Sequence, residues 1–459
     1  MCGIVGIKYN NYTHNGLEIY EALLSIQHRG QDGAGISYMD NNKLEMIKGK
    51  GLIYNLFSYD DLKKMNGSVF LGHTRYKTNN IINSFQPFHL KSEKLEISFC
   101  HNGNITNVNK IEIELNNKYK IKNNNKESDS FILFQLIFYY LNSEVKKSNT
   151  ISVSELNDYL CHIVEGSYSI IMHIKNFGLI VLKDKNGIRP LVYGKNKNND
   201  CLVSSESCSL INVVDYKIIR EVEPGEIIYF KNNSEEETHK CALSLFTPCL
   251  FEYIYFSRLD SIVNNISIYK CRFMLGELLG NKLLEKKLNI DFIIPTPETS
   301  RVYAYGISKV MGLPIQECII KNRYINRTFI IENKETIGEN IKRKFSVISE
   351  VVRNKNVLLV DDSIVRGNTS KSIIKLLKDS GVKQVIFASA APKIFNTNKF
   401  GIHIEQKEEL ITYKNTTNEK IAKSINCDSI YYNDLNEVIN TVHELNNSIN
   451  NMEISMFQN

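Results

Sequence analysis

The sequence predicts two domains of different fold class: an α+β domain of stacked, largely antiparallel sheets over residues 2–245, and an α/β domain with a mainly parallel, doubly wound sheet over residues 246–459. Three observations lead to this division. A chain of 459 residues suits two or three domains. Short β-rich runs dominate the first half, whereas strand and helix patterns alternate in the second. A polar tract at residues 231–240, expected to be a solvated loop, precedes a new apolar run near Leu243.

Two helical patterns interrupt the strands of the first half. One covers residues 17–27 and is stopped by Gly30, and the other covers residues 130–142 and is capped by Asp129. Short runs rich in β-branched and apolar residues predict the strands. These runs lie at residues 3–8, 69–72, 97–100, 168–174, 179–183, 191–194, 202–204 and 226–230.

The second half contains two strand–helix–strand units, whose helices end at Gly312 and Gly381. Loops at residues 295–300 and 361–370 follow the carboxyl ends of two strands, which is where the ligands of doubly wound sheets bind. The expected strands are residues 291–294, 313–320, 356–360 and 382–388, and the expected helices are residues 301–311 and 371–380.

Composition excludes several classes of protein. With 42% hydrophobic and 23% charged residues the chain is globular, and a net charge of +6 is too small to indicate a nucleic-acid partner. The strongest apolar stretch, residues 131–141, is shorter than the roughly 18 residues of a membrane span. Ten scattered cysteines without a C-x-x-C pair, and a start that lacks a secretory pattern, indicate a reduced, cytoplasmic protein.

Cys2 is the first candidate for catalysis. Removal of Met1 leaves a thiol and an α-amino group on one residue. An α-amine with a pKa of about 7.7–8.0 is partly neutral near pH 7 and can accept the proton of a thiol whose pKa is about 8.5. The alternative is that Cys2 is merely a small apolar residue at the start of a strand.

Polar segments elsewhere in the first half provide what a free amino acid substrate needs. Arg75 can hold an α-carboxylate, Asp129 can pair with an α-ammonium group, and Asn102 with the Gly103 N–H can form an oxyanion hole. Taken singly, these residues also suit a surface ion pair, a helix cap and a turn, respectively. The segments concerned are residues 28–35, 72–76, 101–104 and 128–130.

The Cys2-Gly-Ile start, His28-Arg29-Gly30, Arg75-Tyr76 and His101-Asn102-Gly103 resemble the glutaminase domain of class II glutamine amidotransferases. That domain is an N-terminal-nucleophile hydrolase, with stacked antiparallel sheets between helices. The resemblance implies that Cys2 attacks the side-chain amide of glutamine, forms a thioester and releases ammonia. It assigns catalysis to Cys2, Asn102 and Gly103, and glutamine binding to Arg29, Arg75 and Asp129.

In the second half, a buried strand at residues 357–360 ends in Asp361 and Asp362, and a hydroxyl-rich loop enters a helix. Backbone N–H groups at residues 367–370 suit a phosphate, because a helix N-terminus binds anions. The sequence lacks the Gly-Lys-Ser/Thr ending of a Walker A loop. Two adjacent carboxylates can accept hydrogen bonds from ribose hydroxyls. Taken alone, the pair also suits helix capping or surface charge.

This segment resembles the phosphoribosylpyrophosphate (PRPP) signature of type I phosphoribosyltransferases. The resemblance implies that Mg²⁺ arrives with PRPP and lies near Thr299, Asp361 and Asp362, with water completing its shell. It assigns PRPP contacts to Asp361, Asp362, Ser363, Arg366, Gly367, Asn368, Thr369 and Ser370, to Glu298, Thr299 and Ser300, and to Lys321, Arg323, Tyr324 and Lys344.

The order of the two domains resembles the amidophosphoribosyltransferase family. The resemblance implies that ammonia from glutamine displaces pyrophosphate from PRPP, giving 5-phosphoribosylamine, pyrophosphate and glutamate in the first committed step of purine biosynthesis. It further implies a homotetramer inhibited by purine nucleotides of the AMP and GMP type. Residues 321–345 would close over PRPP, with Arg327, Lys342 and Arg343 as further contacts, and Tyr76 and Tyr255 would lie between the domains.

Departures from the family pattern concern the PRPP half. Leu259 replaces a proline, Asn368 replaces a threonine, and residues 336–340 lack basic side chains, which bears on PRPP affinity and loop closure. Some members carry an iron–sulfur cluster. Residues 394–401 have no cysteine and none follows Cys427, so the four thiolates of a cluster are not assembled and we predict none.

Two other functions compete with this reading. Another amidotransferase, such as glucosamine-6-phosphate synthase, shares the glutaminase motifs, but the loop at residues 361–370 argues against it. A non-catalytic, PRPP-sensing regulator shares the second fold, but it has no use for an intact site at Cys2.

Overall fold

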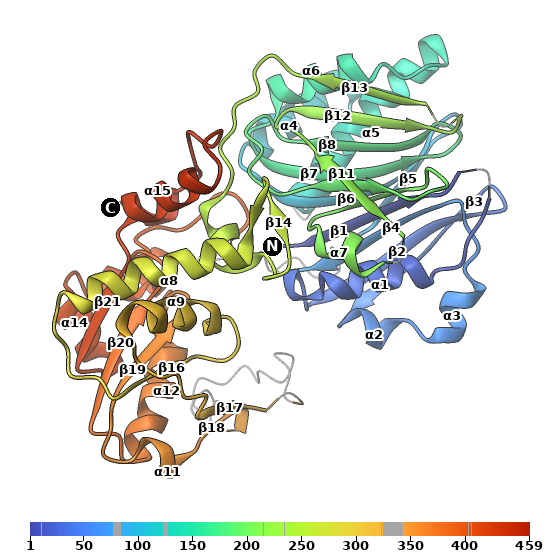
Figure 1. Ribbon diagram of the computed structural model, residues 1–459. Coiled ribbons are helices and arrows are strands. Elements are labelled where there is room, and N and C mark those ends of the chain that lie inside the picture. Colours follow the sequence, from blue (N-terminus) through green and yellow to red (C-terminus); the bar gives the residue numbers. More distant parts are fainter. Residues whose placement is uncertain are drawn as a thin grey trace.

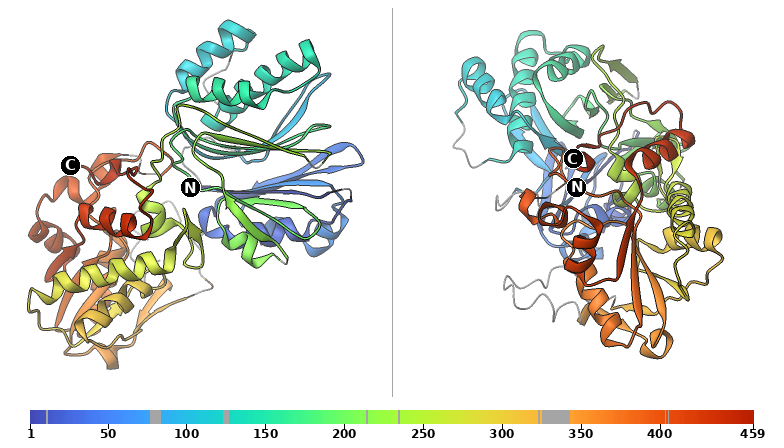
Figure 2. Two further views of the ribbon diagram at one scale, coloured as in Figure 1. Left: turned by 45° about the horizontal axis from the view of Figure 1, so that its top comes forward. Right: turned by 90° about the vertical axis from the view of Figure 1, so that its left-hand side faces the viewer.

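The computed structural model has two bodies that follow one another along the chain, blue to green and then yellow to red in Figure 1. The first consists of two packed sheets between helices, and the second is built around a smaller sheet (Figure 2). The structure describes residues 1–10, 12–76, 84–122, 127–213, 215–233, 235–322, 324, 343–402, 404 and 406–459.

The first sheet places the chain start at its centre. β1 (Gly3–Lys8) pairs antiparallel with β4 (Val69–Arg75) on one side and with β10 (Cys201–Ser204) on the other. All six residues of β1 are buried, so Cys2 directly precedes a fully enclosed strand. The strand order is β11-β9-β10-β1-β4-β2-β3. The remaining strands are β2 (Gly33–Asp40), β3 (Lys43–Lys50), β9 (Val192–Lys195) and β11 (Lys217–Glu221).

The second sheet is also antiparallel and stacks on the first (Figure 2, left). Its order is β13-β12-β8-β7-β6-β5. Ile4 of β1 and Ile171 of β7 belong to the apolar layer between the two sheets. The strands are β5 (Phe88–Lys91), β6 (Glu96–Ile105), β7 (Gly166–Ile174), β8 (Gly178–Lys183), β12 (Glu226–Lys231) and β13 (Glu236–Lys240).

Helices cover the outer face of each sheet. Val5 and Ile7 of β1 pack with Leu23 of α1 on the side opposite to Ile4, as the period of two along a strand requires. A separate cluster joins the other sheet to its helices. The first sheet carries α1 (Leu17–Ser25), α2 (Ile53–Leu56), α3 (Tyr59–Lys64) and α7 (Cys208–Asn212), and the second carries α4 (Val108–Tyr119), α5 (Asp129–Ser148) and α6 (Val153–Ile163). The expected α+β class is confirmed.

The second body contains a four-stranded parallel sheet in the order β16-β19-β20-β21. In β19, Leu358 and Val360 face one apolar cluster, whereas Val357 and Leu359 face another. Helices therefore pack on both faces, and the expected doubly wound class is confirmed. The strands are β16 (Phe292–Pro295), β19 (Asn356–Asp361), β20 (Gln384–Ser389) and β21 (Ser429–Tyr432), and the main helices are α8 (Ile268–Leu284), α9 (Arg301–Met311), α12 (Asn368–Asp379), α14 (Asn418–Ile425) and α15 (Leu435–Leu445).

Two sequence predictions about elements were wrong. Residues 313–320 do not form a strand of the parallel sheet: Ile315 makes a single bridge to Ile293, and β17 (Ile319–Lys321) pairs instead with β18 (Phe345–Val347). Pro314 interrupts the run, and proline cannot donate to a sheet ladder. The tract at residues 231–240 is not wholly a loop, because it contains the edge strand β13, whose charged side chains suit an exposed edge.

Within the described residues, no helix has the length and apolar character needed to cross a bilayer.

Candidate active sites

Cys2 is held by contacts from three neighbouring segments. Its backbone N–H donates to Asn102 Oδ1 at 3.1 Å, and its carbonyl oxygen accepts from Arg29 Nε at 3.1 Å. Its thiol contacts Tyr76, whose N–H lies 3.5 Å from Sγ and whose carbonyl oxygen lies 3.8 Å from it. The thiol is partly exposed, although the strand that follows is buried. These contacts fix both the backbone and the sulfur of Cys2.

Cys2 opens into a pocket of about 440 Å³, part of which is open solvent. Arg75 and Asp129 line the same pocket, so the structure brings together the groups expected to bind an α-carboxylate and an α-ammonium. Arg75 lies over the ring of Phe85, with 5.3 Å from guanidinium carbon to ring centroid. Asp129 does not cap α5 as predicted: Ser128 does, through the Phe131 N–H at 3.2 Å. Asp129 instead accepts from the Ile105 N–H at 3.0 Å.

Asn102 and Gly103 lie inside β6 and not in a turn. A Cβ at Gly103 would lie 2.0 Å from the carbonyl oxygen of Ser167, so only glycine fits there. Asn102 is 1% exposed, and its Oδ1 is engaged by the Cys2 N–H. Its Nδ2 has no hydrogen-bond partner among the described atoms. A buried amide donor beside the thiol is what an oxyanion requires.

Two neutral histidines border the pocket. Burial, followed by the charge of Arg75, lowers the pKa of His73 to about 3, and both ring nitrogens of His73 are buried without a partner in the described structure. Burial also lowers the pKa of His101. Its Nε2 lies 3.3 Å from the Ser167 carbonyl oxygen, which can only accept, so Nε2 carries the proton. His73 lies in the segment 72–76 that the sequence analysis identified, but no role was predicted for it.

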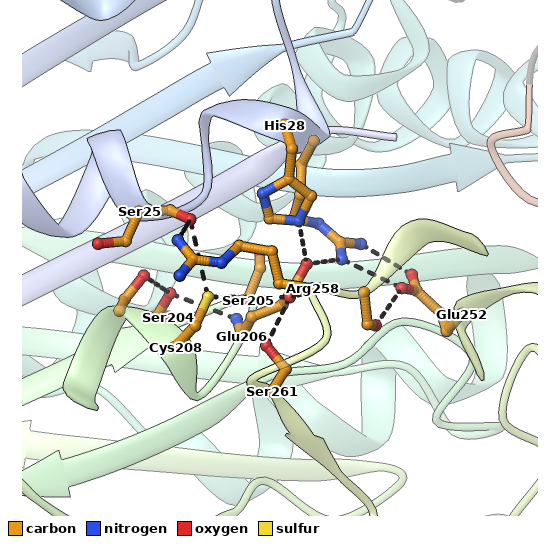
Figure 3. Close-up of polar contacts among 12 residues, drawn as sticks. Ser25, His28, Ser204, Ser205, Glu206, Cys208, Glu252, Arg258 and Ser261 are labelled. Atoms are coloured by element: carbon orange, nitrogen blue, oxygen red, sulfur yellow. Dashed lines mark hydrogen bonds and ion pairs between the residues drawn. The ribbon is translucent and has the colours of Figure 1, made fainter. Parts of the chain in front are cut away.

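Arg29 was predicted to contact glutamine, yet it is absent from the described residues that line the pocket. It is 1% exposed, and its guanidinium lies 2.6 Å from Glu206 and 2.7 Å from Glu252. His28 contacts the same Glu206 at 2.8 Å (Figure 3). The geometry supports a role in holding Cys2 rather than in binding substrate. Glu206 and Glu252 were not predicted as functional residues from the sequence.

The second candidate site lies at the carboxyl end of β19, where Asp361 and Asp362 meet the loop that follows β16. Ser300 Oγ donates to Asp361 at 3.0 Å, and the Thr299 hydroxyl donates to Asp362. Ser363 Oγ donates to Asp362 at 2.7 Å. The two loops that the sequence singled out are thus joined by side-chain hydrogen bonds.

Both carboxyl groups are buried and adjacent, which disfavours their charge. Burial raises the pKa of Asp361 well above its ordinary value, and the neighbouring Asp362 raises it further. Burial also raises the pKa of Asp362, against the hydrogen bonds from Thr299 and Ser363. Carboxylate and hydroxyl oxygens are the donors that Mg²⁺ prefers. Mg²⁺ usually keeps several waters and binds through one or two carboxylates together with substrate phosphates, which this pair of carboxyl groups fits. Among the described residues no group of three or more His, Cys, Asp or Glu side chains is arranged to hold a metal ion.

Gly367 initiates α12 with a φ of +78°, and a Cβ there would lie 2.6 Å from Ile411 Cδ1. The helix begins at Asn368, three residues earlier than expected, so Asn368, Thr369 and Ser370 form its first turn. The N–H groups of a first turn have no partner within the helix and suit a phosphate.

The remaining predicted PRPP contacts have different surroundings. Arg366 faces Glu409 at 2.7 Å, and Lys321 lies 3.8 Å from Glu298, so two predicted contacts pair with each other. Tyr324 is 95% exposed. Lys344 Nζ lies 5.6 Å from the ring of Phe345. Arg323, Arg327, Lys342 and residues 336–340 lie outside the described residues.

The two predicted interdomain tyrosines occupy different surroundings. Tyr76 contacts the Cys2 thiol. Tyr255 packs against Phe251 and Phe256, with ring centroids 5.6 and 5.4 Å away, at the edge of the core of the second half. That core also contains Met1, so the chain start and the second half share one apolar cluster. Arg189 makes a further link, from its Nε to the Phe400 carbonyl oxygen at 3.0 Å.

Family comparisons divide the chain in the same way. The glutamine amidotransferase domain matches residues 73–212, and the phosphoribosyl transferase domain matches residues 263–401. Fold and site together define a glutaminase joined to a phosphoribosyltransferase. The boundary at residue 245 stays a prediction, because it falls between the two matches.

Comparison with full-length relatives shows which family within this class the chain resembles. The amidophosphoribosyltransferase of Escherichia coli strain K12 is 37% identical over 471 residues, covering 100% of this chain and 92% of that protein. That of Methanocaldococcus jannaschii is 35% identical, covering 96% of this chain and 94% of that protein. The solved glutamine PRPP amidotransferase of B. subtilis, complexed with ADP and GMP, has a TM-score of 0.82 at 31% identity, covering 96% and 92% of the two chains.

The chain belongs to the amidophosphoribosyltransferase family. The function expected from the sequence is therefore confirmed: the protein is the glutamine-dependent enzyme that acts on PRPP in purine biosynthesis.

Proposed function

We propose that this enzyme hydrolyses glutamine at Cys2, once Met1 has been removed, and uses the ammonia at the loops that follow β16 and β19. One observation carries the first half of the proposal: Cys2 shares a pocket with Arg75, Asp129 and Gly103, and the buried amide nitrogen of the neighbouring Asn102 has no hydrogen-bond partner among the described atoms. The α-carboxylate of glutamine would bind Arg75, and its α-ammonium group would bind Asp129. Bound in this way, glutamine presents its side-chain amide to the sulfur of Cys2.

The α-amine of Cys2 acts as the base. Its nitrogen already lies 3.1 Å from Asn102 Oδ1, which would orient the amine after Met1 is lost. The amine takes the thiol proton, and the thiolate attacks the amide carbon. The Asn102 amide and the Gly103 N–H receive the oxyanion. The ammonium returns its proton to the leaving nitrogen, ammonia departs, and water then hydrolyses the thioester to glutamate. Burial lowers the pKa of both neighbouring histidines, so they are weak proton acceptors, and this supports the amine as base.

In the second site, ammonia displaces pyrophosphate from C1 of PRPP. Asp361 and Asp362 accept hydrogen bonds from the ribose hydroxyls and offset the positive charge that develops at C1. The first turn of α12 holds the 5′-phosphate, and the loop containing Thr299 receives the pyrophosphate. Mg²⁺ near Thr299, Asp361 and Asp362 supplies charge neutralisation for the leaving pyrophosphate when bound.

We further propose a cytoplasmic homotetramer inhibited by purine nucleotides of the AMP and GMP type. The B. subtilis relative was solved with ADP and GMP, and a second relative, with a TM-score of 0.84 at 30% identity, is described as the allosteric regulatory enzyme of purine biosynthesis. Both descriptions support nucleotide control here. No iron–sulfur cluster is expected, because residues 394–401 contain no cysteine and none follows Cys427.

The test is pyrophosphate release from PRPP and Mg²⁺, with glutamine or ammonium chloride as nitrogen donor, on protein whose N-terminus is identified by mass spectrometry. We expect both donors to work, and Cys2→Ala to lose glutamine use while keeping ammonia use. A Cys2→Ala enzyme that still uses glutamine would exclude Cys2 as nucleophile. Failure of both donors in the unsubstituted protein would exclude the second site as described.

A further inference from the structure

A buried ion network lies where the two halves of the molecule meet (Figure 3). Its centre is Arg29, whose Nη1 lies 2.6 Å from Glu206 Oε1 and 3.1 Å from Glu252 Oε2, and whose Nη2 lies 2.7 Å from Glu252 Oε1. Side chains of all three residues are at most 2% exposed. The remaining donor, Nε, points to the Cys2 carbonyl oxygen at 3.1 Å. Four of the five N–H donors of this planar group therefore have a named acceptor.

The two carboxylates come from different halves. Glu206 follows β10 of the first sheet, whereas Glu252 begins a short π-helix, η2 (Glu252–Phe256), in the segment that leads into the second half. Ser257 Oγ donates to Glu252 Oε2 at 3.0 Å, and Arg189 Nη1 lies 3.6 Å from Oε1. Glu252 is thus oriented by its own turn as well as by Arg29.

The same turn is held from the PRPP side. Arg272 of α8 donates to the carbonyl oxygens of Tyr253 at 2.8 Å and Ser257 at 2.7 Å. Tyr303 of α9 donates through its hydroxyl to the Ile254 carbonyl oxygen at 2.6 Å. The helix α9 begins directly after the loop that contacts Asp361 and Asp362.

We propose that Glu252 is a positioning residue for the glutaminase reaction: held by the PRPP half, it orients Arg29, which in turn fixes the backbone of Cys2. The proposal rests on the role assigned to Cys2 above. It makes the glutaminase site incomplete without the second half of the chain, although no residue of η2 lines the glutamine pocket.

The physical reason is geometric. Glu206 accepts from Nη1, so with Glu252 neutralised one carboxylate remains to orient a group of five donors, and the guanidinium can turn. Cys2 would then lose its fixed carbonyl contact while its N–H and thiol contacts persist. Misplacement of a reacting atom by about 1 Å costs about 10²-fold in rate, so a partial loss of orientation is expected to cost on the order of tenfold.

The test compares two reactions of one full-length protein. We expect Glu252→Gln, which keeps shape but removes charge, to lower the kcat with glutamine about tenfold. The KM for glutamine and the rate with ammonium chloride should stay within about twofold, because neither the substrate contacts nor the PRPP loops are altered. Glu252→Asp, which keeps the charge, should recover part of the lost rate. Thr247→Val is the control, since it removes a different link between the halves, the hydrogen bond from Thr247 Oγ1 to the Asn186 carbonyl oxygen at 3.1 Å.

An unchanged glutamine-dependent kcat in Glu252→Gln overturns the proposal, and so does an equal fall in the glutamine and ammonia rates, which marks a purely structural network. If Glu252→Gln does not fold, Ser257→Ala decides, because it removes only the hydrogen bond to Glu252. It should lower the glutamine-dependent kcat two- to threefold, because Glu252 keeps its charge and its contacts with Arg29 but loses one orienting hydrogen bond. It should leave ammonia use unchanged, and no change in the glutamine-dependent kcat overturns the proposal. Cys2→Ala, measured in parallel, reports separately whether the nucleophile itself was assigned correctly.

Discussion

The two candidate sites differ in how their groups are held. At the glutaminase site, Cys2 directly precedes the buried strand β1 and Asn102 lies inside β6, and each is engaged by a hydrogen bond that involves the main chain of Cys2. At the PRPP site, Lys321 ends the short strand β17 and Arg366 lies in a loop, and both of these predicted basic contacts pair with acidic neighbours. A covalent nucleophile must be placed before its substrate arrives, whereas a site for a polyanion with its own Mg²⁺ can exchange internal ion pairs for the ligand.

The largest expected effect is at the rigid site. Asn102→Ala removes the buried donor beside the thiol, and loss of one oxyanion donor costs about 10²–10³ in kcat. Glutamine-dependent product formation should fall by this factor in a steady-state assay, with ammonia-dependent formation intact. If the glutamine-dependent kcat falls by less than about threefold, the oxyanion is stabilised at Gly103 and around the thiol without the Asn102 amide. The proposed difference between a rigid glutaminase site and an adaptable PRPP site would then be wrong.

The next effect should appear at the loop site with both nitrogen donors. Asp362→Asn removes a carboxylate that Thr299 and Ser363 orient, and we expect about a tenfold to hundredfold loss of pyrophosphate release with glutamine and with ammonia alike. Hydrolysis of glutamine in the absence of PRPP should be unchanged. Loss of that hydrolysis would mean that the two sites are not separable in the way the contacts suggest.

A smaller effect is expected for the exposed pair Arg366 and Glu409. Exposed ionic contacts contribute about 0.2–1 kcal/mol, so Arg366→Ala should raise the KM for PRPP by about fivefold at most, with kcat little changed. Glu409→Gln is the matched control, because it releases Arg366 and should leave the KM unchanged or lower it. If Glu409→Gln raises the KM as much as Arg366→Ala does, the pair supports the loop rather than exchanging for PRPP.

The smallest effect concerns the pH dependence of stability, which should have opposite signs in the two regions. Burial and Asp362 raise the pKa of Asp361, so the folded state prefers its protonated form and loses stability as pH rises above the unfolded pKa of about 3.9. Burial opposes the charge of Glu206, but His28 and Arg29 outweigh it and hold its pKa below the ordinary range. Glu206 therefore contributes stability above an unfolded pKa of about 4.3 that is lost as pH falls.

Urea unfolding at pH 5 and pH 8 checks this difference. Asp361→Asn should be more stable relative to the unsubstituted protein at pH 8 than at pH 5. Glu206→Gln should be less stable at both values. If the difference in the free energy of unfolding between Asp361→Asn and the unsubstituted protein does not change with pH, the fold does not disfavour the charged form of Asp361.

The sequence predicted the helices and strands whose position depends on short-range patterns of apolar, polar and glycine residues. β1 was predicted with its observed bounds because it is a short apolar run that ends in polar residues, and α9 because Gly312 stops an apolar period of 3.6. The strands β2 and β3 were missed, because β3 is polar and partly exposed and owes its pairing to its neighbour. Asp361 and Asp362 were predicted as site residues because the motif resembling the PRPP signature begins where an apolar strand ends.

Other site features depend on contacts between distant parts of the chain. Arg29 and Glu206 are 177 residues apart, and Arg29 and Glu252 are 223 apart, so no local pattern joins them. The family resemblance consequently assigned Arg29 to glutamine binding. Burial of all three side chains, visible only in the fold, supports the positioning role proposed above instead.

The position of Met1 bears on the order of events during synthesis. Its side chain is 2% exposed and packs with the apolar core that includes Leu250 and Tyr253, and burial lowers the pKa of its amino group to about 4. A processing enzyme cannot reach it there. If Met1 is removed as proposed, its removal precedes the packing of Met1 against Leu250 and Tyr253. At about 5–20 residues per second, ribosomes take on the order of 10–50 s to reach residue 250, and this interval is the window in which the proposed nucleophile is made.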